Sequence, residues 1–192
     1  MSTIGLPRLP RLPAEWEPQA AVLLTWPHPA TDWAAQIEAV EAVYLRIAAA
    51  VTARQRLLVV CNDAGHRAQV RGRLAAADIP LGAVSLAIAA SNDTWTRDHG
   101  PLIVLDSAAR AQAVDFRFNG WGGKFPADLD DRITARLHAA GWLGDTALTA
   151  SPLVLEGGAI DTDGAGNLLA VRRTLLDPAR NPGWDQAAIE KE

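Results

Sequence analysis

The chain has 192 residues, of which 49% are hydrophobic and 21% charged, an ordinary globular composition with enough residues for a substantial core. Its net charge of −4 and pI near 5.5 argue against a general nucleic-acid binder, because such proteins are usually basic. The single cysteine, Cys61, excludes a disulfide framework within the chain and fits a reducing compartment. Residues 1–13 lack the apolar core of a signal peptide, and no apolar run is long enough to span a membrane. We therefore expect a cytoplasmic protein whose partners include neither nucleic acid nor membrane.

Strands and helices alternate in the first half of the sequence. Short apolar runs predict buried strands at 20–26, 56–61 and 84–88. Thr31 or Asp32 is expected to cap a first helix, and residues 64–77 are expected to form a second. The first helix should bury a stripe of side chains that recur every three or four positions: Trp33, Ile37, Val40, Val43 or Tyr44, Ile47 and Val51.

The second half of the sequence places strands in pairs between helices. The expected elements are strands at 102–105, 113–118, 153–156 and 168–171, a glycine-rich loop at 119–123, a helix at 128–140 and a turn at 161–167. Adjacent strand pairs favour repeated ββαβ-like units over the strict alternation of a doubly wound parallel sheet. A last helix at 186–192 is capped by Asp185 but has no stop signal, so we expect the chain to end within an element.

The most informative segment is residues 92–101, which lies between two expected strands. It gathers aromatic and charged side chains in a short space: Asp93, Trp95, Arg97, Asp98 and His99. A carboxylate beside an aromatic ring suits a planar cation such as a guanidinium, because the carboxylate accepts paired N–H donors while the ring covers the face. The alternative is a structural Arg97–Asp98 contact with Trp95 as core filler.

A second carboxylate, Glu156, directly follows the expected strand that includes Leu153 to Leu155. A side chain just past a buried strand can enter a pocket, and Gly157 and Gly158 would permit close backbone approach. The alternative is a bulge or turn in which Glu156 is solvated.

Three other patterns are interpreted as structural. Residues 118–124 lack the spacing of a Walker motif or a dinucleotide fingerprint, so we expect a turn with Trp121 packed inward. Cys61 ends a run of buried aliphatics and is expected to be a small hydrophobe rather than a nucleophile, which would need activation by a base. The four histidines lack metal-ligand spacing, so no metal site is expected.

Five stretches, taken together and in order, resemble the pattern of a known family. They are 13–18 (PAEWEP), 25–27 (TWP) with Trp33, 92–101 (NDTWTRDHGP), 114–124 (VDFRFNGWGGK), and 155–158 (LEGG) followed by Asp163 and Gly164. The tail at 175–182 (LLDPARNP) adds to the pattern. The ordered set resembles the agmatine deiminase family, which is similar in sequence to bacterial-type peptidylarginine deiminases.

The resemblance implies a pentein-type α/β propeller, a ring of ββαβ units around a central site. It also implies a hydrolase of guanidino groups that takes a small cationic substrate and uses neither metal nor cofactor. In this family a cysteine thiolate attacks the guanidine carbon, a histidine moves protons and two aspartates hold the guanidinium. By position, Asp98 matches the first aspartate, with a catalytic and substrate-binding role, Trp95 matches the aromatic wall, and Glu156 matches a further substrate contact.

The sequence departs from the family pattern in its reactive groups. The family's catalytic His and second Asp form a His-x-Asp motif that would lie beyond residue 192, and its nucleophilic Cys lies near the end of a chain almost twice as long. Cys61 does not match that position, and Asp161 stands where many relatives carry His. We therefore expect residues 1–192 to form a single incomplete domain, truncated at its C-terminus and equivalent to about half of the propeller.

The leading functional hypothesis is an agmatine deiminase-like hydrolase. It would convert agmatine and water to N-carbamoylputrescine and ammonia in polyamine biosynthesis, and this chain alone would be inactive because the catalytic Cys and His are missing. One alternative is a peptidylarginine deiminase with an open cleft for a longer substrate. Another is a non-catalytic partial propeller that binds guanidino compounds or a partner surface. Its exposed inter-blade face would be apolar and prone to associate with other chains, so homo-oligomers are among the expected assemblies.

Overall fold

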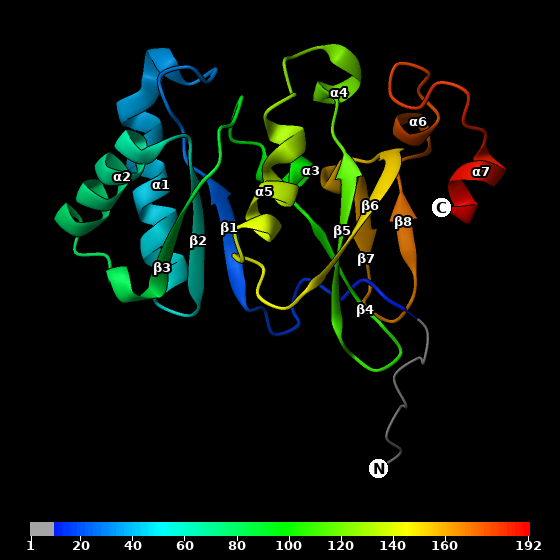
Figure 1. Ribbon diagram of the computed structural model, residues 1–192, viewed down its shortest axis with the longest axis horizontal. Helices are drawn as coiled ribbons and strands as arrows, with labels where there is room; N and C mark the ends of the chain where they lie inside the picture. Colours follow the sequence, from blue (N-terminus) through cyan, green and yellow to red (C-terminus); the bar gives the residue numbers. More distant parts are fainter. Residues whose placement is uncertain (1–9) are drawn as a thin grey trace. The chain divides into compact units, whose positions relative to one another are not determined.

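The computed structural model describes residues 10–192 (Figure 1), so the expectation about the first nine residues lies outside the described part. Contacts between residues divide the chain into two compact units. The parallel unit comprises Pro18–Thr96 and Pro126–Trp142, and the mixed unit comprises residues up to Glu17 together with Arg97–Phe125 and Leu143–Glu192. The expectation of a single incomplete domain stays a prediction.

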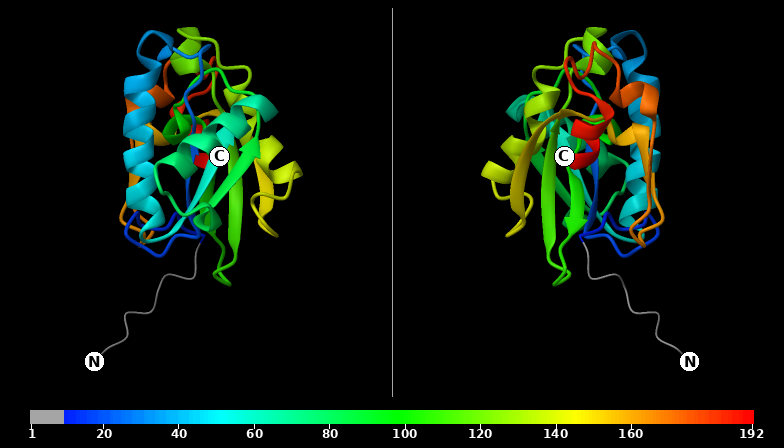
Figure 2. Two further views of the ribbon diagram at one scale, coloured as in Figure 1. Left: turned by 90° about the vertical axis from the view of Figure 1, so that its left-hand side faces the viewer. Right: turned by 90° about the vertical axis from the view of Figure 1, so that its right-hand side faces the viewer.

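The parallel unit is built on three strands in the order β1-β2-β3: β1 (Ala21–Thr25), β2 (Arg56–Cys61) and β3 (Val84–Ile88). Both strand pairs are parallel, and they are connected through α1 (Ile37–Thr52) and α2 (Ala64–Ala76). Since both crossovers step in the same direction, right-handed connections place the two helices on one face of the sheet. Figures 1 and 2 show α1 and α2 beside these strands.

The core of the parallel unit lies between the two helices and one face of the sheet. Its buried members come from every layer: Trp26, Ala48, Leu57, Val59, Cys61, Val70, Leu74 and Ile79. The alternate residues Leu58 and Val60 are buried on the opposite face of β2, as expected for a central parallel strand. Asp63 begins α2 by accepting a hydrogen bond from the His66 backbone N–H at 2.8 Å.

The predicted apolar stripe of α1 is wrong in part. Ile47 is exposed, and of the alternatives Val43 and Tyr44 only Tyr44 packs against the core, whereas Glu41 and Ala48 are the buried residues of the helix. The Glu41 carboxylate accepts a hydrogen bond from the Trp26 indole at 3.0 Å and pairs with Arg73 at 2.9 Å. These contacts need Glu41 to point inward, so the helix is rotated away from the orientation that hydrophobic periodicity predicts.

The start of α1 also differs from the prediction. The regular helix begins at Ile37 after a short 3-10 helix, η1 (Ala34–Gln36), and neither segment has a side-chain cap. Thr31 uses its hydroxyl to donate to the His28 carbonyl oxygen at 2.8 Å. The predicted cap by Thr31 or Asp32 is therefore wrong, because a local turn takes the Thr31 hydroxyl before the helix begins.

A second departure concerns the helix expected at 128–140. It is observed as a 3-10 helix, η3 (Asp130–Arg132), followed by α5 (Ile133–Ala139). The Asp130 carboxylate accepts from the Asn92 backbone N–H at 2.7 Å, and the Asn92 side-chain oxygen accepts from the Leu129 and Asp130 N–H groups. This reciprocal bonding ties residues 128–130 to the 92–101 segment and delays the regular helix.

The mixed unit contains two small sheets. β4 (Leu102–Leu105) and β5 (Ala111–Arg117) are antiparallel, and β6 (Ala147–Val154) is parallel to β5. β7 (Ile160–Thr162) and β8 (Leu168–Ala170) form an antiparallel pair. The remaining short elements are α4 (Gly120–Gly123), η4 (Gly157–Ala159), α6 (Arg172–Leu175) and α7 (Gln186–Lys191), while α3 (Thr96–His99) crosses the boundary between the units.

The expected ββαβ unit is present in chain order as β4, β5, α5 and β6, whereas the first three strands alternate strictly with helices. β6 begins six residues earlier than predicted, and the short helix α6 was not predicted. Asp185 caps α7 as expected, accepting from the Ala188 N–H at 2.8 Å. Within the described residues, no helix combines the length and apolarity needed to cross a membrane.

The buried Glu41 contact gives a test of this fold. We expect Glu41→Ala to lower the free energy of unfolding by about 1–3 kcal/mol, because it leaves the buried Trp26 indole N–H without its acceptor. Urea unfolding followed by circular dichroism measures the change. Glu38→Ala, on the exposed side of the same helix, is the matched control and should stay within about 0.5 kcal/mol of the unsubstituted chain. Equal effects of the two substitutions would contradict the inward orientation of Glu41.

Candidate functional site

In the candidate site, two donors from other parts of the mixed unit hold the Asp98 carboxylate. Its Oδ2 atom accepts a hydrogen bond from the Trp121 indole N–H at 3.0 Å. Its Oδ1 atom accepts from the Gly158 backbone N–H at 3.0 Å. An ionised carboxylate offers about four acceptor positions, so these two bonds fix its orientation and leave capacity for a further donor.

The glycine pair after Glu156 is explained by how closely the chain approaches α3. A Cβ atom on Gly158 would lie 2.5 Å from Asp98 Oδ1, and one on Gly157 would overlap the backbone carbonyl oxygen of Arg97. A side chain at position 157 would therefore push the α3 backbone away, and one at position 158 would displace the Asp98 carboxylate. The structure thus joins two motifs that are about 60 residues apart in sequence, the Asp98 segment and the Glu156-Gly157-Gly158 turn.

Trp121 reaches Asp98 because the glycine-rich loop adopts an unusual backbone. Trp121 itself has φ +59° and Gly122 has φ +85°, both in the left-handed region, so α4 is a tight turn rather than a regular helix. Asn119 closes the turn by accepting from the Gly122 N–H at 2.8 Å. The prediction of a turn is confirmed. The hydrogen bond from the Trp121 indole to Asp98 was not predicted. A non-glycine residue held in the left-handed region is, however, typical of functional loops.

Arg97 does not form the structural ion pair considered in the sequence. Its guanidinium pairs with Glu15 at 2.6 Å instead of with its neighbour Asp98. Arg97 and Glu15 line a pocket of about 400 Å³ in the mixed unit, together with Gly158, Asp161 and other residues at β7 and β8. The interpretation of Arg97–Asp98 as a local structural contact is therefore wrong, and Asp98 keeps its charge for other partners.

Glu156 is buried and already paired with a cation. Its Oε1 atom accepts from Arg180 Nε at 2.6 Å, and Arg180 also donates to Asp177 Oδ2 at 2.7 Å. The alternative of a solvated Glu156 is wrong, because the segment 177–181 folds over it. Nearby, the Asn181 amide bonds to the Val154 backbone in both directions, at 2.8 and 3.0 Å, and so fixes the end of β6. The role of Glu156 as a substrate contact stays a prediction.

Trp95 belongs to the parallel unit. It is 42% exposed, and its ring centre lies 6.2 Å from that of Trp33. The Trp33 indole in turn donates to the Thr94 hydroxyl at 2.9 Å. The interpretation of Trp95 as core filler is wrong, because a filler would not leave this much of its surface open to solvent. An exposed indole can cover the face of a cation.

His99 and Cys61, two titratable residues considered in the sequence, are both buried. His99 is 4% exposed beside Phe118, and burial lowers its pKa to about 4, so the imidazole is neutral near pH 7. Cys61 is fully buried in the core of the parallel unit, and burial raises the pKa of its thiol to about 12. The expectation that Cys61 is a packed hydrophobe is confirmed, since a thiol with this pKa supplies almost no thiolate at neutral pH.

Comparison with known proteins identifies the family of this chain. The model of the Porphyromonas-type peptidyl-arginine deiminase family matches residues 11–192. The chain belongs to this family. An agmatine deiminase of Pseudomonas aeruginosa (strain LESB58) is 34% identical over 190 residues, which cover 94% of this chain and 48% of that relative.

Solved structures of the peptidyl-arginine deiminase family and its relatives share the fold. The agmatine deiminase of Enterococcus faecalis has a TM-score of 0.82 and 29% identity, covering 98% of this chain and 52% of that chain. A cysteine-to-serine variant of the C. jejuni agmatine deiminase with substrate bound has a TM-score of 0.84 and 28% identity, covering 95% and 52%. The fold is the pentein-type α/β propeller, and the chain spans about half the length of the curated relatives it matches.

The close approach of the glycine pair gives a test of the site in this deiminase-family chain. We expect Gly157→Ala to lower the free energy of unfolding by about 1–3 kcal/mol, because the new methyl group overlaps the Arg97 backbone, which cannot move freely. Urea unfolding measures the loss. Gly72→Ala is the control: it lies within α2 with open space around it, and it should raise the free energy of unfolding by about 0.5–1 kcal/mol. A neutral Gly157→Ala would mean that the turn does not pack on α3 as described.

Proposed function

We propose that this chain supplies the cation-binding wall of an agmatine deiminase-like hydrolase. The observation that carries the proposal is the Asp98 carboxylate, oriented by the Trp121 indole and the Gly158 N–H in a member of the deiminase family. A carboxylate with open acceptor positions binds the paired N–H donors of a guanidinium. Trp95, with an exposed indole, is proposed as the aromatic wall that covers the cation.

The proposed reaction of the whole enzyme is hydrolysis of a C–N bond of the guanidino group. Agmatine and water would give N-carbamoylputrescine and ammonia, a step toward putrescine and the polyamines. In it, Asp98 would hold the guanidinium and orient its carbon for attack. Glu156 is proposed as a further substrate contact, with Arg180 holding its carboxylate in a fixed orientation. We propose a cytoplasmic location for the enzyme.

The nucleophile cannot come from the one cysteine in these 192 residues. Attack on a guanidine carbon needs an accessible thiolate, whereas Cys61 is fully buried and its thiol has a pKa of about 12. We therefore propose that binding and chemistry are separable, and that this chain binds guanidino compounds without hydrolysing them. It would contribute about half of a propeller whose reactive groups lie outside these residues.

The first test of this proposal is a turnover measurement. The purified 192-residue chain incubated with agmatine should release no ammonia above a heat-treated control, because it offers no activated nucleophile. A coupled ammonia assay measures the rate. Cys61→Ala is the matched variant, and the same background rate is expected from it. Ammonia release that disappears in Cys61→Ala would show that the buried thiol reacts and would overturn the proposed division of roles.

The second test is binding. Isothermal titration with agmatine should show a complex that Asp98→Asn weakens by about 10- to 100-fold, since a hydrogen bond to a charged group contributes about 1.5–3 kcal/mol. Asp145→Asn makes the same charge change at an exposed position of the mixed unit and should leave the affinity unchanged. Equal affinities of the two variants, or no binding by the unsubstituted chain, would contradict the assignment of Asp98.

A second candidate is a peptidylarginine deiminase, which the description of the matching family favours. The same carboxylate would bind the guanidinium of an arginine side chain within a peptide. Titration with a blocked arginine peptide, run beside agmatine, distinguishes the two substrates. Tighter binding of the peptide would favour this second candidate, and binding of neither would leave only a non-catalytic role.

A further inference from the structure

The free edge of β3 is the strongest unexplained feature of the parallel unit. β3 is the last strand of its sheet and pairs only with β2 among the described residues. The Ala89 N–H donates to the Cys61 carbonyl oxygen at 3.0 Å, so Ser85 and Ala87, at alternate positions before it, also face β2. The N–H and C=O groups of Val84, Leu86 and Ile88 therefore point to the open edge, where another strand can pair with them.

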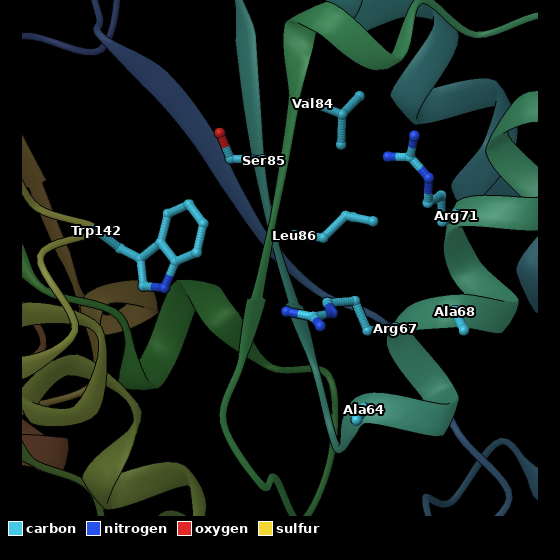
Figure 3. A pocket seen from close by; sticks show the side chains of 8 residues that line it. All are labelled: Ala64, Arg67, Ala68, Arg71, Val84, Ser85, Leu86 and Trp142. Atoms are coloured by element: carbon cyan, nitrogen blue, oxygen red, sulfur yellow. The ribbon is translucent and has the colours of Figure 1, made fainter.

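A groove of about 510 Å³ runs along this edge and includes both faces of the strand. Figure 3 shows Val84 and Leu86 on the side of α2, from which the side chains of Arg67 and Arg71 extend toward β3. Ser85 and Trp142 lie on the opposite side of the strand. An extended chain added at the edge would therefore place alternate side chains beside the arginines and beside the exposed Trp142 indole.

The two arginines are unneutralised within the part of the chain that the structure describes. Both are exposed on α2, and no hydrogen bond or ion pair joins either guanidinium to a residue in 10–192. They are four residues apart on a helix, a rise of about 6 Å. Side chains on one face of a strand repeat at intervals of about 6.6 Å. Acidic residues at every second position of an added strand would thus match the spacing of Arg67 and Arg71.

We propose that the β3 edge binds an extended segment of a partner polypeptide in which acidic residues alternate with apolar ones. Main-chain hydrogen bonds to Val84 and Leu86 supply the pairing, and the acidic side chains bind Arg67 and Arg71. The apolar side chains pack on Trp142. A second copy of this chain does not fit, because pairing two β3 edges about a twofold axis would bring the arginines of both copies onto the same face.

The proposal is tested with a fluorescein-labelled peptide of alternating glutamate and valine, seven residues long, and the full 192-residue chain. Fluorescence anisotropy should show saturable binding that Arg67→Glu combined with Arg71→Glu weakens at least about tenfold, since like charges then face each other. Arg46→Glu combined with Arg54→Glu is the matched control with the same charge change on and just after α1, and it should bind as the unsubstituted chain does. The charge-reversed chain should in turn bind a lysine–valine peptide. Equal binding of the acidic peptide to both double variants overturns the proposal.

Methylation of the peptide's backbone nitrogens distinguishes strand pairing from binding by charge attraction alone. One peptide is methylated on the backbone nitrogens of all glutamates and another on those of all valines. In a paired strand only one of these sets points toward β3, so one peptide should lose binding while the other keeps it. Equal retention by both would mean that the peptide binds through charge alone, and it would overturn the assignment of the β3 edge.

Discussion

The packing of Gly157 and Gly158 against α3 is the contact on which the candidate site depends. At this point the backbone of one turn touches the Arg97 carbonyl and the Asp98 carboxylate, with no room for a Cβ atom between them. The same approach brings the Gly158 N–H within hydrogen-bonding distance of Asp98. A steric constraint and an electrostatic contact therefore act on the same carboxylate, and together they hold it in one orientation.

The two carboxylates of the site differ in how their charge is compensated. Asp98 accepts from two neutral donors, so its negative charge is oriented but not cancelled. Glu156 is paired with the Arg180 guanidinium inside the protein and is almost fully buried. This contrast supports the proposal that Asp98 rather than Glu156 binds the cation, while the position of Glu156 depends on the fold of the 177–181 segment.

The elements of the parallel unit could be predicted because each depends mainly on local apolar patterns. The three strands and both helices lie where the sequence placed them, within a few residues. The inward side of α1 could not be predicted. It depends on the Trp26–Glu41–Arg73 contacts, and those residues come from three separate parts of the chain.

The sequence by itself determined the family, the order of most elements and the identity of the candidate carboxylates, because ordered motifs and hydrophobic periodicity are properties of the chain read along its length. Only the tertiary structure decided what each carboxylate touches. Trp121 reaches Asp98 through a left-handed turn, Arg180 neutralises Glu156, and Arg97 pairs with Glu15 rather than with its neighbour. These partners are distant in sequence or selected by backbone geometry, and hydrogen bonds depend on distances and angles that no residue pattern records.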